Sequence, residues 1–221
     1  MAAKTLFTRG DFIAILSRYD LGTYTHSQAV EQGTVQTTYF VHTKRGRFVF
    51  RYYENRPMGS VRFEADLLAY LADQHYPCPR QIKDKGGNVV GLYGGKPYAI
   101  TEFIDGRPLQ NPAAHHWRRL IQKAAELQTL STGFHSPYTP YRWNYDSDLC
   151  RRLAHDRALR INTADAYAKF AWLERELANL DLPASLPKGI CHCDFHFSNV
   201  LFQGDEFAAL IDFDDANYTY L

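Results

Sequence analysis

This sequence lacks both long apolar runs and an excess of charge of one sign. No apolar run approaches the roughly 20 residues that a membrane-spanning helix needs, and the N-terminal stretch MAAKTLFTRGDF has no apolar signal-peptide core. Lys and Arg number 25 against 24 Asp and Glu, which gives no electrostatic footprint for nucleic acid or an anionic membrane. We therefore expect a cytoplasmic protein that binds neither nucleic acid nor membrane.

Cysteine is scarce, and its spacing excludes two common uses. The chain has four cysteines, Cys78, Cys150, Cys191 and Cys193. A cytoplasmic chain keeps them reduced, and they fit neither a disulfide framework nor a zinc ribbon, which needs two paired clusters. Hydrophobic residues make up 45% of the chain, which is enough for a packed core in one large domain or two small ones.

The first half of the chain has the pattern of an antiparallel sheet. β-rich runs over residues 37–43 and 47–53 flank the turn Lys44-Arg45-Gly46, and this turn chemistry predicts a hairpin. Further strands are predicted over residues 24–31, 88–92 and 98–103. We take residues 1–104 as the first predicted domain, a β-rich lobe.

Two helices are predicted within this half. The stretch GDFIAILSRY, residues 10–19, predicts a short helix with Asp11 as its N-cap. Residues 60–74 predict a longer helix with Ser60 as its N-cap. The longer helix is inserted between the strands of the predicted sheet.

The second half, residues 105–221, has a mainly helical pattern. Asn111-Pro112 predicts a cap followed by proline at the first helical position, and this helix runs to about Leu130. A second helix is predicted over residues 163–180, with a buried stripe of apolar residues. That stripe comprises Tyr167, Phe170, Ala171, Leu173, Leu177 and Leu180. Short strands over residues 200–202 and 207–212 complete the second predicted domain.

The stretch CHCDFHFSN, residues 191–199, raises the alternative of a metal site. If its first part is extended, Cys191 and Cys193 face one side while His192 and Asp194 face the other. No second cluster in the sequence completes a tetrahedral set, and the Cys-x-x-Cys redox motif is absent. We therefore interpret the cysteines as small packing residues. A metal-binding module stays as an alternative.

The polar residues of the same stretch have the spacing of a kinase catalytic loop. His192, Asp194 and Asn199 give H-x-D-x4-N, and two strands around a tight turn then lead to Asp212 in the sequence IDFDD. Asp194 is suited to orient an acceptor hydroxyl and take its proton. Asn199 and Asp212 offer the oxygen ligands that Mg²⁺ prefers, and His192 is expected to support the loop. The alternative is that these residues only cap turns.

A kinase also needs a cation on a strand and a carboxylate on a helix. Arg51 lies in the β-rich run 47–53, and Glu64 lies beside the apolar stripe of the helix 60–74. A carboxylate on that stripe is costly unless it is paired. We therefore expect Arg51 to pair with Glu64 and to aim its guanidinium at the nucleotide phosphates.

Two further segments are suited to hold a nucleotide. The loop 32–37 has a single glycine, Gly33, in place of G-x-G-x-x-G. Its candidate phosphate contacts are backbone amides and the hydroxyls of Thr34, Thr37 and Thr38. In YAITEFIDG, residues 98–106, backbone groups of Glu102 and Ile104 are candidates for hydrogen bonds to adenine.

Together these segments resemble the aminoglycoside phosphotransferase/choline kinase-like family, and within it the homoserine kinase type. The segments, in the family's order, are GTVQTTYFV, GRFVFRYYENR, FEADLLAYLADQHYPCPRQI, AITEFIDGRPL, CHCDFHFSNVLF and LIDFDDA. The resemblance implies an α+β, two-lobed protein-kinase-like fold, with an antiparallel N-terminal lobe and a mainly helical C-terminal lobe. It also implies ATP- and Mg²⁺-dependent phosphorylation of a small-molecule hydroxyl. In that reaction Asp194 is the base, and Asn199 and Asp212 bind the metal.

The sequence departs from the family pattern at three places. Arg51 stands where lysine is frequent, and its rigid fork is not equivalent to an ammonium group. Cys193 stands where the H-G-D loop has glycine, so a side chain must fit where none is usual. Relatives continue with several helices after the D-F-D segment, whereas this chain stops at Leu221. We therefore expect an incomplete C-terminal lobe.

The resemblance predicts homoserine or a related small amino alcohol as the acceptor. Aminoglycosides, choline and ethanolamine are the alternatives. An acidic wall of Asp214 and Asp215 would favour a cationic amine, and His196 is a candidate for contact with the acceptor. The alternative from another class is a non-catalytic, pseudokinase-like nucleotide-binding protein, which the missing helices favour and the intact catalytic and metal residues oppose.

Overall fold

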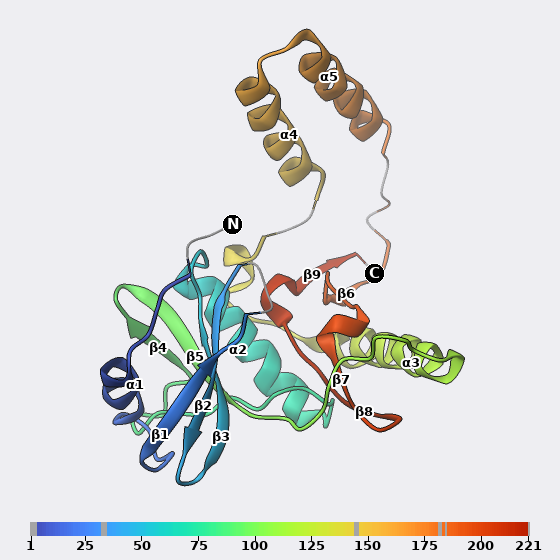
Figure 1. Ribbon diagram of the computed structural model, residues 1–221. Coiled ribbons are helices and arrows are strands. Elements are labelled where there is room, and N and C mark those ends of the chain that lie inside the picture. The colour runs from blue at the N-terminus through green and yellow to red at the C-terminus, as the bar shows by residue number, and fades with distance from the viewer. Residues whose placement is uncertain (1–3, 32–34, 144–145, 181–182, 184, 221) are drawn as a thin grey trace.

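The computed structural model describes residues 4–31, 35–143, 146–180, 183 and 185–220, and these form two lobes (Figure 1). The N-terminal lobe holds a five-stranded antiparallel sheet in the order β1-β2-β3-β5-β4. Its strands are β1 (Tyr24–Ala29), β2 (Thr37–Thr43), β3 (Gly46–Tyr52), β4 (Val90–Tyr93) and β5 (Lys96–Glu102). Each strand overlaps a predicted one, so the predicted antiparallel sheet is confirmed.

The two faces of this sheet differ because successive side chains on a strand alternate. One face is buried against helix α1 (Arg9–Leu16), where Phe12 packs with Tyr39, Phe50 and Tyr98. The opposite face turns toward helix α2 (Met58–Asp73) and the second lobe. The alternating side chains therefore place the core with α1 on one face of the sheet and leave the other face available for a site.

Three helix starts differ from the prediction. Thr8 caps α1 in place of Asp11, whose carboxylate accepts from the Thr8 backbone N–H at 2.7 Å in a capping box. Helix α2 begins after Pro57, and the Ser60 hydroxyl accepts a hydrogen bond from Arg142 at 3.0 Å instead of capping the helix. Helix α3 (Ala114–Leu130) begins after Ala113, so Asn111 is not its cap.

The C-terminal lobe joins helices to two small two-stranded antiparallel sheets. It contains α3, α4 (Ser147–Ile161) and α5 (Ala164–Ala178), with short 3₁₀ turns at Ser131–Gly133 and Thr139–Tyr141. Strand β6 (Lys188–Cys191) pairs with β9 (Asn217–Tyr220), and β7 (Val200–Gln203) pairs with β8 (Glu206–Leu210). Further 3₁₀ turns lie at Phe197–Asn199 and Phe213–Asp215. Helix α4 and the strands β6 and β9 were not predicted, because they are short or lack a clear apolar period.

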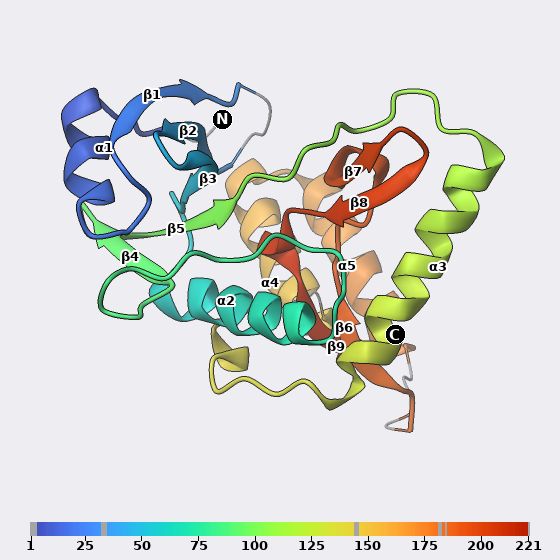
Figure 2. The same cartoon turned by 90° about the horizontal axis from the view of Figure 1, so that it is seen from below.

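Helix α2 unites the two lobes. Its apolar side belongs to one core cluster with Ile190 of β6, Val200 and Phe202 of β7, and Phe213. Figure 2 shows α2 extending from the sheet toward β6 and β9. The residues around CHCDFHFSN are therefore built onto the same core as the helix that carries Glu64.

Helices α4 and α5 form a hairpin that stands away from the body of the molecule (Figure 1). The predicted buried stripe of α5 is wrong: Tyr167 is 41% exposed and Leu180 is 53% exposed. Among the described residues α5 packs mainly on α4, so only a narrow seam that includes Phe170, Leu173 and Leu177 is half-buried. No helix in the described part of the chain is both long and apolar enough to cross a bilayer.

Candidate active site

The candidate active site is a cleft of about 640 Å³ between the lobes. The sheet contributes Val49 and Ala99 on one side, and the second lobe contributes Leu201 and Ile211. These apolar pairs are the kind of surface that holds a flat base. At the same cleft lie five polar residues from distant parts of the chain, Arg51, Glu64, Asp194, Asn199 and Asp212.

Strand register explains which sheet residues reach the cleft. Val49 of β3 lies opposite Phe40 of β2 and Thr101 of β5, and Arg51 lies opposite Thr38 and Ala99. Because side chains two residues apart share a face, these two rows both point toward the second lobe. Val49 and Thr101 lie close to the end of β5, where the chain continues to the second lobe. Arg51 and Ala99 lie two residues further from that end along their strands.

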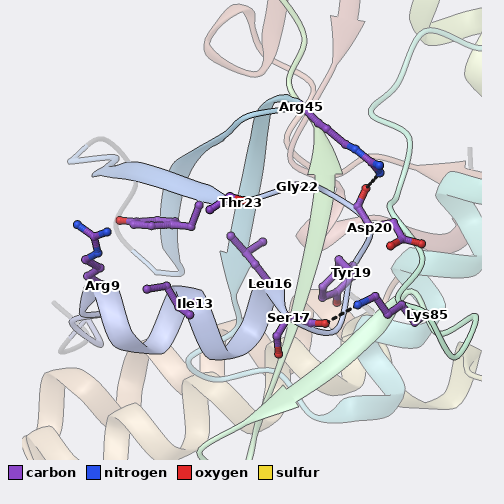
Figure 3. Close-up of a pocket in the computed structure, with 11 residues that line it drawn as sticks. Arg9, Ile13, Leu16, Ser17, Tyr19, Asp20, Gly22, Thr23, Arg45 and Lys85 are labelled. Atoms are coloured by element: carbon purple, nitrogen blue, oxygen red, sulfur yellow. Dashed lines mark hydrogen bonds between the residues drawn. The ribbon is translucent and has the colours of Figure 1, made fainter.

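A second hollow, of about 440 Å³, lies against α1 on the other side of the sheet (Figure 3). Lys85 and Arg45 line it, and each donates to a backbone carbonyl, at Ser17 (2.9 Å) and Asp20 (2.6 Å) respectively. It holds none of the residues predicted to do chemistry. We therefore take the cleft between the lobes as the candidate site.

The predicted catalytic loop is tied directly to the predicted metal-binding segment. The ring Nε2 of His192 donates to the carbonyl of Ile211 at 3.0 Å, and the Ile211 N–H donates to the carbonyl of Asn199 at 2.8 Å. His192 is buried and packs edge-on against Phe213. Burial lowers the pKa of His192, which makes it a neutral support for the loop.

Asn199 and Asp194 are held together by the asparagine amide. The Asn199 nitrogen donates to the Asp194 carbonyl at 3.0 Å and to its carboxylate at 2.7 Å. Because the nitrogen is used in this way, the amide oxygen of Asn199 is the atom left to bind a cation. Carboxylate and amide oxygens are ligands that Mg²⁺ prefers, so Asn199 and Asp212 fit a magnesium ion.

Asp212 directly follows the Ile211 link and adopts a left-handed backbone with φ of 67°. Its carboxylate accepts from the Arg51 guanidinium at 2.6 Å. Burial opposes ionisation of Asp212, but the charge of Arg51 outweighs it and lowers the pKa of the carboxyl. Asp212 is therefore a charged ligand candidate.

The predicted ion pair between Arg51 and Glu64 is not among those that the described residues form, and the prediction was wrong on this contact. Both residues line the cleft. Burial raises the pKa of Glu64 to about 7, against the lowering effect of Arg51. The guanidinium pairs with Asp212 at 2.6 Å, and this pairing keeps Asp212 ionised.

The nucleotide-loop residues are placed differently from one another. The Thr37 hydroxyl donates to the Glu54 carboxylate at 2.7 Å on the buried side of β2, so it points away from the cleft, and Thr38 lines the cleft instead. The one-residue alternation along the strand is the reason. Gly33 and Thr34 lie outside the described residues. Glu102 and Ile104 both line the cleft beside the connector.

The residues predicted to contact an acceptor also differ. Asp214 is 6% exposed and is held by the Arg56 guanidinium, with Nε at 3.0 Å, so its charge is already balanced. Asp215 lines the cleft and accepts from Arg56 at 2.5 Å. The ring of His196 is exposed, accepts from the Ser198 N–H at 3.3 Å, and does not line the cleft. Of the three, Asp215 is the residue that both lines the cleft and is not fully buried.

Sequence reasoning assigned no role to two arginines that support the site, Arg142 and Arg56, because their partners are distant in the sequence. Arg142 is buried and donates to the backbone carbonyls of Phe213, Asp214 and Ala216 at 2.6–2.9 Å. Arg56 binds the carboxylates of the same turn. Their partners lie at least 71 residues away in sequence, so no local pattern signals them.

The metal-module alternative gains no support. Among the described residues, the candidate ligand cluster is His115, His116 and Asp205, which lies outside CHCDFHFSN. The Nδ1 of His116 accepts from the Ala113 N–H at 3.0 Å, so Nε2 carries the ring proton and donates to Asp205 at 3.2 Å. A protonated nitrogen has no lone pair for a metal. This cluster is therefore a hydrogen-bonded contact between α3 and the β7–β8 turn.

Cys193 has φ of 63°, in the left-handed region that favours glycine. This conformation destabilises the folded state by about 1–2 kcal/mol when the residue has a side chain. Glycine avoids that strain, but its greater freedom in the unfolded chain cancels about 0.5–1 kcal/mol of the gain. We expect Cys193→Gly to raise the melting temperature by about 1–4 °C, measured by thermal denaturation. Cys193→Ala, which keeps the Cβ, is the control. A Cys193→Gly protein that melts no higher than the alanine variant would contradict the strain.

Glu64 sets a second expectation, on pH. Its folded pKa of about 7 lies above the ordinary 4.5, so its protonation stabilises the fold below about pH 4.5 and that contribution is lost as the pH rises through 7. We expect Glu64→Gln to be more stable than the unsubstituted protein at pH 8, on the order of 2 kcal/mol, in denaturant titrations from pH 5 to 8.

Glu54→Gln is the control of opposite sign. Burial opposes ionisation of Glu54, but hydrogen bonds from Lys96 and Thr37 lower its pKa to about 2. Its stabilising contribution is present above the ordinary pKa and is lost as the pH falls toward 2, so this variant should be less stable at pH 8. Equal stability of Glu64→Gln and the unsubstituted protein at pH 8 would refute the assignment for Glu64.

Comparison with known proteins places this arrangement in a family. Residues 26–221 match the phosphotransferase enzyme family, APH. The homoserine kinase of Sinorhizobium medicae (strain WSM419) is 30% identical over 216 residues, which cover 96% of this chain and 65% of that protein. The homoserine kinase of Caulobacter vibrioides (strain NA1000 / CB15N) is 31% identical over 232 residues, which cover 100% of this chain and 70% of that protein.

Solved structures support the fold. The amicoumacin kinase hAmiN, in complex with AMP-PNP, Ca²⁺ and Ami, aligns with a TM-score of 0.70 at 15% identity, covering 94% of this chain and 67% of that one. A microcompartment-associated aminopropanol kinase aligns with a TM-score of 0.69 at 17% identity, covering 95% and 70%. The predicted protein-kinase-like fold is thus confirmed. This chain spans 65% of the length of the Sinorhizobium protein. The chain belongs to the phosphotransferase enzyme family.

Proposed function

We propose that this protein transfers the γ-phosphoryl group of ATP to the hydroxyl of a small molecule. The observation that supports this most is the set of contacts joining residues 192–199 to residue 211, which brings Asp194, Asn199 and Asp212 to one cleft. The family match and the homoserine kinase relatives support the same reaction class. The acceptor oxygen bonds to the γ-phosphorus, the bond to the ADP oxygen breaks, and the hydroxyl proton passes to Asp194.

Each residue then has a distinct role. Asp194, oriented by Asn199, accepts the proton from the acceptor hydroxyl. Asn199 and Asp212 would hold Mg²⁺, which would neutralise part of the phosphate charge when bound. Arg51 binds phosphate oxygens, and Glu64 lines the same cleft. Val49 and Leu201, which line the cleft, would hold the base, and backbone groups of Glu102 and Ile104 would hydrogen-bond its edge.

For the acceptor we propose homoserine or a related small amino alcohol. The homoserine kinase relatives and the aminopropanol kinase neighbour support this choice. Asp215, which lines the cleft, provides a carboxylate for an ammonium group. Aminoglycosides, choline and ethanolamine are the alternatives. An ATP-consumption assay across these compounds ranks them, with the deoxy analogue of each hit as the control that has no hydroxyl to phosphorylate.

Loss of the proposed base should abolish most of the turnover. We expect Asp194→Ala to lower kcat by about 10²- to 10⁴-fold, the usual contribution of a positioned acid or base. The measurement is ADP release at saturating ATP and acceptor, with ATP binding to the variant as the control for folding. Near-normal turnover by the variant would remove Asp194 from the mechanism.

The metal role of Asp212 is tested without turnover. We expect ATP with Mg²⁺ to raise the melting temperature of the unsubstituted protein more than ATP alone, because a bound ligand stabilises the folded state by mass action. Asp212→Asn should lose the Mg²⁺-dependent part of this shift. A shift of equal size in the variant would refute the role. A non-catalytic nucleotide-binding protein would show the shift but no ADP release.

A further inference from the structure

Two polar side chains outside the proposed chemistry converge on the turn that carries Asp212. Arg56 precedes α2, and its guanidinium grips Asp214 with Nε at 3.0 Å from one carboxylate oxygen and an Nη at 3.3 Å from the other. The same Nη lies 2.5 Å from Asp215. The Arg56 side chain is only 7% exposed, so this pairing takes place away from water. A bidentate arginine–carboxylate contact of this kind fixes both the position and the orientation of the carboxylate.

Gln36, the residue before β2, adds a second link to the same carboxylate. Its amide nitrogen donates to Asp214 at 2.8 Å and to Asn55 at 3.0 Å, while its amide oxygen accepts from the Glu54 N–H at 2.8 Å. Gln36 is buried and directly precedes β2. The chain on one side of the nucleotide cleft is thus joined through one side chain to the turn on the other side.

The turn needs such support because its backbone is strained. Asp212 has φ of 67° and begins the 3₁₀ turn Phe213–Asp215. A non-glycine residue in this conformation costs energy and persists only when its surroundings hold it. The two carboxylates also share one Arg51 nitrogen, which lies 2.6 Å from Asp212 and 3.8 Å from Asp214. Whatever fixes Asp214 therefore fixes the carboxylate that is proposed to hold the metal.

We propose that Arg56 and Gln36 are positioning residues that set the Asp212 carboxylate for the metal by clamping Asp214. This rests on the proposed function, and it gives Asp214 a structural role in place of the acceptor contact that its sequence position suggested. Arg56 does not line the cleft, and the amide of Gln36, which does, is bound to Asp214, Asn55 and the Glu54 N–H. Their effect passes through Asp214 to Asp212, so it falls on metal binding and turnover instead of on acceptor affinity.

The test uses Arg56→Lys, which keeps the positive charge but removes the fork. We expect the half-saturating Mg²⁺ concentration for the ATP-dependent thermal shift to rise by about 10- to 100-fold, as for other residues that orient metal ligands. The KM for the acceptor should stay unchanged while kcat falls. Asp214→Asn, which keeps the shape and removes the charge, should behave alike.

Arg18→Lys is the matched control. It makes the same change in an arginine–aspartate pair, Arg18 with Asp84 at 3.1 Å, that does not line the cleft. It should leave both the Mg²⁺ half-saturation and kcat unchanged. If Arg56→Lys does not fold, Gln36→Leu carries the test, with a smaller rise of the half-saturating Mg²⁺ concentration in the same direction.

The outcomes separate this inference from the proposed function. An unsubstituted protein with no Mg²⁺-dependent shift at all would overturn the proposed function, and this inference with it. An unsubstituted protein that shows the shift, together with folded Arg56→Lys and Asp214→Asn proteins of unchanged Mg²⁺ half-saturation, would overturn only the positioning role. A raised acceptor KM with normal Mg²⁺ half-saturation would also overturn it, because it would return Asp214 to the acceptor site.

Discussion

A short buried hydrogen-bond link holds the candidate site together. The Ile211 backbone accepts from His192 at 3.0 Å and donates to Asn199 at 2.8 Å, so the two halves of the site cannot move apart without leaving buried polar groups unpaired. The residue after this link is Asp212, and Asp194 is bound to Asn199 on the other side. These hydrogen bonds therefore bring residues that are separated in the sequence into a single cluster.

Charge balance determines how the side chains around this cluster pair. Two arginines, Arg51 and Arg56, face Asp212, Asp214 and Asp215, and the buried Glu64 has a pKa raised to about 7. Removing a charge from water is costly unless a partner compensates it. Arg51 pairs with Asp212 and keeps that carboxylate ionised. Glu64 has a raised pKa, so it holds a proton more tightly and lowers the cost of burying a charge. The same rule explains why Asp214 is committed to Arg56 and is buried.

Prediction succeeded where a local pattern has a direct geometric meaning. The period of two in β2 and β3 identifies the strands, and H-x-D-x4-N with a following hairpin identifies the cluster, because a hairpin returns its two ends to one place. Prediction failed where a partner lies elsewhere in the chain. The apolar stripe of α5 has a helical period, but among the described residues mainly α4 packs against it, so much of the stripe stays exposed. Thr37 and Thr38 are adjacent and chemically identical, and only the face of the strand that each occupies decides that Thr38 lines the cleft.

The sequence alone determined the sheet, the strand that carries Arg51, and the loop and turn that carry Asp194, Asn199 and Asp212, since each depends on residues close together in the chain. The tertiary structure alone decided that Arg51 pairs with Asp212, that Asp214 belongs to Arg56 and Gln36, and that α4 and α5 stand apart. Those outcomes depend on burial and on contacts across as many as 178 residues of chain. The free energy of a charge depends on how much water and which partners surround it, and only the folded chain fixes both.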